Sequence, residues 1–158
     1  MGSRGLPLAE LGLDKAMQRL ASAATEDDAL ITLKEALEWV YVLSEYHRKQ
    51  LGDNKKSFGR RISKSPDGCR SPDGCRLRAL VFARDFEVHE LATWSDLRDV
   101  YSNTYTEMYG VLTWLATAPQ PDPDGRDTDF TDYLAGKPVP DTLRLARDFL
   151  TVGIKDLT

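Results

Sequence analysis

The stretch TEDDALITLKEALEWVYVLSEYHRKQLG, from Thr25 to Gly52, decides the fold class of this chain. Its large apolar residues follow one another by threes and fours, which is the spacing of one face of an α-helix, at Leu30, Leu33, Leu37 and Val40. Thr25 can cap such a helix, with Asp28 three residues later, and Gly52 can end it. The stretch therefore predicts a long helix from about residue 26 to about residue 50 with one broad buried face.

The same spacing recurs on both sides of this stretch. Further helices are expected over residues 8–24, 77–93, 95–117, 130–135 and 141–152. Pro119 ends the fourth of the six helices, and Asp141 is the expected cap of the last. No segment alternates apolar and polar residues over a full strand length. The prediction is one all-α domain over residues 1–158, an up-and-down bundle of four to five helices with a C-terminal helical extension from about residue 129.

Composition limits the possible functions. The 158 residues are 41% hydrophobic, enough for a buried core, and the formal net charge is −4. The chain as a whole is therefore not a basic nucleic-acid binder, although a local basic patch is compatible with this charge. No apolar run approaches the length of a bilayer span, and the N-terminus lacks the apolar block of a secretory signal. We therefore expect a cytoplasmic protein with no membrane partner.

The segment from Asp53 to Arg78 has a different composition from the rest. It holds eight basic residues against three acidic ones, and its two SPDG stretches favour turns. We expect a mobile, basic loop at about 53–76. One interpretation is a solvated linker without a partner. The other is an arm that contacts RNA phosphates through Lys55, Lys56, Arg60, Arg61 and Arg78.

Within this segment the hexapeptide SPDGCR occurs twice in tandem, from Ser65 to Arg76. Its cysteines, Cys69 and Cys75, lie six residues apart, which is not the C-x-x-C spacing of a redox or zinc site. We expect two reduced thiols in a loop that tolerates insertion. No metal and no cofactor is expected in this chain.

The apolar stretch RALVFARDFEVHELATW, residues 78–94, contains Arg84, Asp85 and His89. On a helix Arg84 would fall inside the apolar arc, while Asp85 and His89 would form a polar strip with Arg78. A histidine can transfer a proton near neutral pH, and a guanidinium binds phosphate oxygens. With the ribose 2′-hydroxyl as nucleophile, these groups suit metal-independent cleavage of RNA. Alternatively, Arg84 pairs with Glu87 or with a carboxylate on another helix, and His89 is a hydrogen-bonded core histidine.

The R-x4-H spacing in RDFEVH and the apolar character of the helix expected around it resemble HEPN-domain proteins. The resemblance implies an all-α bundle of about four or five helices that forms a homodimer, with two copies of the motif in one cleft. It further implies an endoribonuclease of a toxin–antitoxin or antiviral defence system, acting with an antitoxin or defence-system partner and leaving a 2′,3′-cyclic phosphate. His89 would be the general acid or base, Arg84 would bind the phosphate, and Asp85 would orient either. Leu91 stands where one toxin subfamily carries a modified tyrosine, which puts that form of regulation in doubt.

Other features have simpler interpretations. The alternative to an enzyme is a catalytically inactive bundle that binds a partner protein or nucleic acid. Tyr101, Tyr105 and Tyr109 repeat every four residues, which favours packing over stacking on RNA bases. His47, near the end of the long helix, is expected at the surface, where a cation suits the helix dipole.

Overall fold

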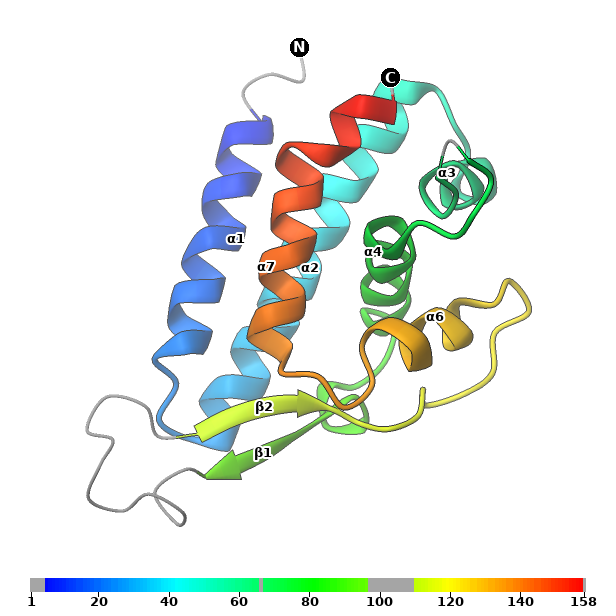
Figure 1. Cartoon of the computed structure of the whole chain (residues 1–158). Helices are drawn as coiled ribbons and strands as arrows, with labels where there is room; N and C mark the ends of the chain where they lie inside the picture. The colour runs from blue at the N-terminus through cyan, green and yellow to red at the C-terminus, as the bar shows by residue number, and fades with distance from the viewer. Residues whose placement is uncertain (1–4, 66, 97–109, 158) are drawn as a thin grey trace.

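Helices make up most of the structure, a computed structural model that describes residues 5–65, 67–96 and 110–157 (Figure 1). The predicted helical bundle is confirmed. Within these three ranges, no helix combines the length and the apolar character that a membrane span requires. In chain order the elements are α1 (Gly5–Ala21), α2 (Glu26–Leu51), α3 (Lys55–Ile62), α4 (Pro72–Ala83), the 3₁₀ turn η1 (Val88–Glu90), β1 (Ala92–Asp96), β2 (Gly110–Trp114), α6 (Arg126–Tyr133), α7 (Val139–Thr151) and the 3₁₀ turn η2 (Gly153–Leu157).

The long helix α2 follows its predicted course. The Asp28 N–H donates to Thr25 Oγ1 at 3.2 Å at its start, and Gly52, with a φ of 72°, closes its end. α1 packs against α2, and α7 lies against both (Figure 1). Their shared core contains fully buried leucines, among them Leu13, Leu33 and Leu143. Truncating one such leucine to alanine would cost about 2–5 kcal/mol of stability.

The C-terminal helices begin earlier than predicted. α6 begins at Arg126 rather than at residue 130, and α7 begins at Val139 with Pro138 in the cap position that Asp141 was expected to take. Proline suits this place because the first turn of a helix needs no N–H from it. α7 packs on α1, α2 and α4, so it belongs to the core of the bundle and is not an extension of it.

A two-stranded antiparallel sheet replaces parts of two predicted helices. β1 pairs with β2 in a register that joins Ala92 to Trp114 and Asp96 to Gly110. The helix predicted over residues 77–93 ends at Ala83, and the one predicted over residues 95–117 is wrong at both of its described ends. In β2, Leu112 and Trp114 are buried while their neighbours are half-buried, which is the alternation of a strand.

Gly110 explains part of this choice. A Cβ at this position would lie 2.0 Å from the ring of Trp94 on the paired strand, so only glycine fits there. Glycine also disfavours a helix interior. Residues 97–109 lie outside the described part of the chain, and the expectation for Tyr101, Tyr105 and Tyr109 lies there with them.

The segment predicted as a mobile loop at about 53–76 is largely helical. Asn54 caps α3, with its Oδ1 accepting a hydrogen bond from the Ser57 N–H at 2.8 Å, while Ser71 caps α4. Polar caps thus start two helices where the charged composition indicated a loop. The described residues between α3 and α4, 63–65 and 67–71, are the part that is not helical.

The two SPDGCR copies adopt different structures. The first makes a turn in which Ser65 N–H donates to the Cys69 carbonyl at 2.7 Å, and the second forms the cap and first turn of α4. Both cysteines are free thiols, but only Cys69 is exposed. Cys75 is buried on α4, so the prediction of two loop thiols is wrong for it. The same six residues adopt two structures because only the second copy is part of α4, which packs against the rest of the bundle.

Candidate nucleic-acid interface

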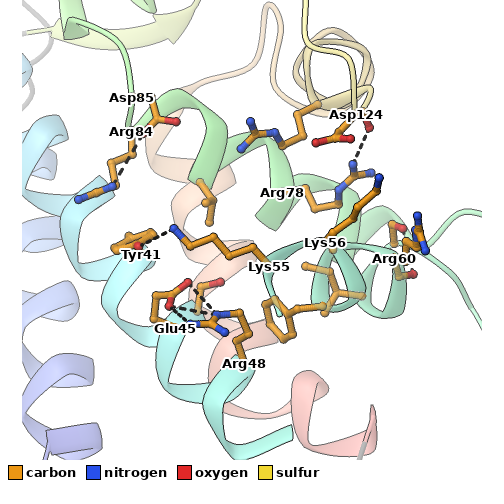
Figure 2. Close-up of a pocket in the computed structure, with 17 residues that line it drawn as sticks. Tyr41, Glu45, Arg48, Lys55, Lys56, Arg60, Arg78, Arg84, Asp85 and Asp124 are labelled. Atoms are coloured by element: carbon orange, nitrogen blue, oxygen red, sulfur yellow. Dashed lines mark hydrogen bonds and ion pairs between the residues drawn. The ribbon is translucent and has the colours of Figure 1, made fainter. Parts of the chain in front are cut away.

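A basic pocket of about 480 Å³ lies between α2, α3, α4 and the segment that leads into α6 (Figure 2). Its volume is in the range of small-ligand sites. Within a chain of net charge −4, its lining carries an excess of positive charge, which a concave surface focuses. The acidic lining residues are Glu45, Asp85 and Asp124, and the basic ones are Arg48, Lys55, Lys56, Arg60, Arg78, Arg84 and Arg126.

Most of the site residues predicted from the sequence meet at this pocket. Arg61 and His89 are the two that do not line it. Arg61 instead forms an ion pair with Asp53, with Nε 2.7 Å from Oδ2. The predicted residues that do line it are Lys55, Lys56, Arg60, Arg78, Arg84 and Asp85.

Two pocket arginines had no signal in the sequence. Arg48 stands in the last turn of α2, and Arg126 begins α6 after a run of aspartates. Arg126 has acidic neighbours in the sequence, and Arg48 belongs to the helix that precedes the basic segment, so neither was counted with that segment. The approach of α2, α3 and α6 to one another, which no local pattern encodes, brings both arginines to the pocket.

Three of the four cations of α3, Lys55, Lys56 and Arg60, form no ion pair with a carboxylate in the described part of the chain; they are called the α3 cations below. Phe58 and Ile62, four residues apart, are buried and hold the helix in place. Lys55, Lys56 and Arg60 are exposed, and none of them forms an ion pair with a residue in the described ranges. Lys55 Nζ lies 3.4 Å from the hydroxyl of Tyr41 on α2, a contact that Figure 2 shows as a dashed line. These three side chains are therefore available to an anion.

Two of the pocket arginines are anchored by single carboxylates. Arg48 Nη2 donates to Glu45 at 2.6 Å, and this hydrogen bond lowers the pKa of the Glu45 carboxyl despite partial burial. Arg126 Nε donates to Asp122 at 2.9 Å and likewise lowers the pKa of Asp122. These ion pairs hold the guanidinium groups of both arginines in fixed positions in the pocket wall.

Arg78 is held from two sides. Its Nη2 donates to the carbonyl of Asp124 at 2.8 Å, and its Nη1 lies 2.9 Å from Asp129 Oδ2, an ion-pair contact without hydrogen-bond alignment. Asp129, 1% exposed, also pairs with Arg70, which reaches Asp132 at 2.8 Å. This network fastens α6 to α4 and fixes Arg78 in the pocket wall.

Arg84 and His89 do not share a helix. α4 ends at Ala83 because the Asp85 and Phe86 N–H groups donate to carbonyls three residues back, at 3.2 and 3.1 Å. Arg84 therefore sits at the end of α4, and His89 lies exposed in η1. The prediction of a single helix carrying both is wrong.

The environment of Arg84 matches the alternative of a partner on another helix. Its Nε lies 3.1 Å from both carboxylate oxygens of Glu38 on α2, and its guanidinium lies over the ring of Tyr41. Asp85 is a more distant partner, 3.8 Å from Nη1. His89 forms no hydrogen bond or ion pair with any residue that the structure describes. It is exposed, so it is not a core histidine.

Comparison with known proteins adds nothing to the geometry of this pocket. No family model, no curated protein sequence and no solved structure matches the chain. The pocket itself offers guanidinium and ammonium groups, which bind phosphate oxygens through charge-assisted hydrogen bonds. Its lining also includes the half-buried Val81, whose apolar side chain can contact a base or a ribose.

Proposed function

We propose that this chain binds RNA, with phosphate groups held in the basic pocket between α2, α3 and α4. The observation that carries the proposal is the set of three cations on α3, Lys55, Lys56 and Arg60, that line the pocket without an ion pair to any described carboxylate. Cations that neutralise phosphates supply most of the affinity in nucleic-acid binding. The arginines of the neighbouring walls are already paired with carboxylates, so the α3 cations provide the free charge.

Acidic residues outnumber basic ones in this chain, 25 to 21, yet among the described residues no carboxylate forms an ion pair with the α3 cations. Like charges gathered at one concave site repel each other, and a bound anion relieves that repulsion. Single-stranded RNA fits better than a duplex, because a pocket of about 480 Å³ admits a nucleotide and excludes a double helix. The apolar side chain of Val81 in the same lining favours a ligand with both phosphate and aromatic parts.

Binding of a short, labelled single-stranded RNA, followed by fluorescence anisotropy at several salt concentrations, tests this proposal. The Lys56→Ala/Arg60→Ala variant should bind more weakly, with a salt slope smaller by about 1.4, since single strands give about 0.7 per phosphate contact. A Lys15→Ala/Lys34→Ala variant makes the same change in net charge at exposed sites away from the pocket. Equal binding by the two double variants would refute the pocket as the RNA site.

Metal-independent cleavage of that RNA is the second candidate function. Arg84 and Asp85 line the same pocket, and His89 is exposed and free of described partners five residues beyond Arg84. A HEPN-like homodimer would combine these groups from two copies of the chain in one cleft. Arg84 would bind the phosphate, His89 would transfer the proton, and Asp85 would orient one of them. A toxin or antiviral defence role, an antitoxin or defence-system partner and a cytoplasmic location belong to this second proposal.

Cleavage is the second proposal because Arg84 Nε already donates to the Glu38 carboxylate, so this part of the guanidinium is not available to a phosphate. Incubation of RNA with the protein in excess EDTA, with analysis of the product ends, decides the matter. Ribonuclease action predicts 2′,3′-cyclic phosphate ends that disappear in both His89→Ala and Arg84→Ala. Activity that survives in both variants, or that requires a divalent metal, would exclude the mechanism while leaving RNA binding intact.

A further inference from the structure

The α3 cations bring three positive charges from one short helix into a single pocket. Lys55 and Lys56 are adjacent, and Arg60 follows little more than one helical turn later. Figure 2 shows Lys55 extending toward Tyr41 on α2, while Lys56 lies toward Arg78 in this view. All three line the same cavity of about 480 Å³.

An RNA backbone does not match this concentration well. Successive diester phosphates carry one negative charge each and are separated by a whole ribose. A terminal phosphate monoester carries about −1.5 to −2 at pH 7. A chain of linked phosphates adds a further charge per phosphate within a few bond lengths, so it places three or more charges inside a single pocket.

The walls of the pocket add cations of fixed position. Three helices and the segment before α6 line it, and Arg48, Arg126 and Arg78 are held by Glu45, Asp122 and Asp129. The half-buried Val81 provides apolar surface for the nucleoside that follows the phosphates.

We infer that the pocket takes a compact polyphosphate group, as carried by the 5′-triphosphate end of an RNA or by a free nucleoside triphosphate. This inference rests on the proposed function, since it names the part of the RNA that enters the pocket. The α3 cations contact the phosphate chain, and the paired arginines form the rigid wall behind it.

Three RNAs of one sequence, labelled at the 3′ end and carrying a 5′-hydroxyl, a 5′-monophosphate or a 5′-triphosphate, test the inference in a binding titration. The triphosphate form should bind about tenfold more tightly than the hydroxyl form, because each added charge gains charge-assisted hydrogen bonds. In Lys56→Ala/Arg60→Ala this ratio should fall toward one, while Lys15→Ala/Lys34→Ala should keep it. Circular dichroism of both variants checks that they are folded.

The outcomes separate the inference from the proposed function. Equal affinity for the three ends, or equal affinity for the monophosphate and triphosphate ends, overturns the inference; RNA binding still stands if the pocket variant weakens all forms. If no RNA binds, or if both double variants behave alike, the proposed function itself fails. ATP, titrated alone, identifies the source of the phosphates: affinity equal to that of the triphosphate RNA assigns the site to a free nucleotide, and much weaker affinity assigns it to an RNA end.

Discussion

The guanidinium carbon of Arg84 lies 3.8 Å from the centre of the Tyr41 ring, and the Tyr41 hydroxyl faces Lys55 3.4 Å away. One side chain of α2 thus contacts the end of α4 through its ring and the start of α3 through its oxygen. A cation over an aromatic face is attracted by the electrons of the ring. Tyr41 therefore sets the position of Arg84 at the rim of the pocket.

A double-mutant cycle measures this contact. Tyr41→Leu and Arg84→Ala should each destabilise the protein, and together they should cost less than the sum of the two, by about 0.5–2 kcal/mol. The free energy of unfolding in urea is the measurement. Tyr41→Phe keeps the ring and should keep the coupling, so it is the matched control. Strict additivity of the two changes would show that the stacking contributes nothing to stability.

Two neighbouring arginines of α3 should differ in RNA binding. Arg60 lines the pocket and has no ion-pair partner among the residues that the structure describes, whereas Arg61 lies outside the pocket and is paired with Asp53. Arg60→Ala should therefore lower the salt slope of RNA binding by about 0.7, the value for one lost phosphate contact. Arg61→Ala removes the same charge one residue away and should leave the slope unchanged. Equal losses would mean that general charge, rather than the pocket, attracts the RNA.

The sequence predicted helix positions better than it predicted helix ends. The apolar spacing, Thr25 and Gly52 located α2 almost to the residue, because caps and a buried face act locally. The end of α4 could not be located in this way. Apolar residues continue past Ala83 as far as Leu91, which is fully buried, so the stretch looks the same whether it is a helix or a turn and a strand.

The site was partly predictable for a related reason. A local excess of lysine and arginine pointed to Lys55, Lys56 and Arg60, although the segment is helical and not a loop. Arg48, on the preceding helix, and Arg126, far along the chain, join the site only through tertiary packing. Such contacts carry no signal in local composition.

His47 should make stability depend on pH. The prediction of a surface cation is wrong for it: burial lowers the pKa of its imidazole below the usual value, against the opposing effects of the Leu150 backbone and Glu10. Its Nε2 is buried and has no hydrogen-bond partner in the described structure. The folded state therefore favours the neutral ring.

The sign follows from proton uptake. The usual pKa of a histidine is about 6.5. Below this pH the imidazole of His47 is protonated in the unfolded chain but stays neutral in the folded chain, so the free energy of unfolding falls as the pH is lowered. The loss levels off below the depressed pKa of the folded state. Urea unfolding at pH 7.5, 6.5 and 5.5 should show this decline, and His47→Gln should flatten it. A decline of the same size in His47→Gln would assign it to other groups.

The duplicated hexapeptide supplies a matched pair of glycines. In the second copy, a Cβ at Gly74 would lie 1.5 Å from the backbone carbonyl oxygen of Ile62, so α3 and α4 can meet there only through glycine. In the first copy, Gly68 faces open space but has a φ of 86°. Gly68→Ala should therefore cost about 1–2 kcal/mol, the usual penalty of a left-handed conformation.

Gly74→Ala should cost more, because backbone atoms of α3 must move and Phe58 and Ile62 move with them. We expect a loss of about 3 kcal/mol or more, in the range of strong core disruption. Thermal unfolding of the two variants compares them directly, since both make the same substitution in the same six-residue context. RNA affinity should fall in Gly74→Ala as well, because displacement of α3 moves the pocket cations, and it should be kept in Gly68→Ala. A Gly74→Ala protein with normal stability would show that α3 and α4 do not meet at this glycine.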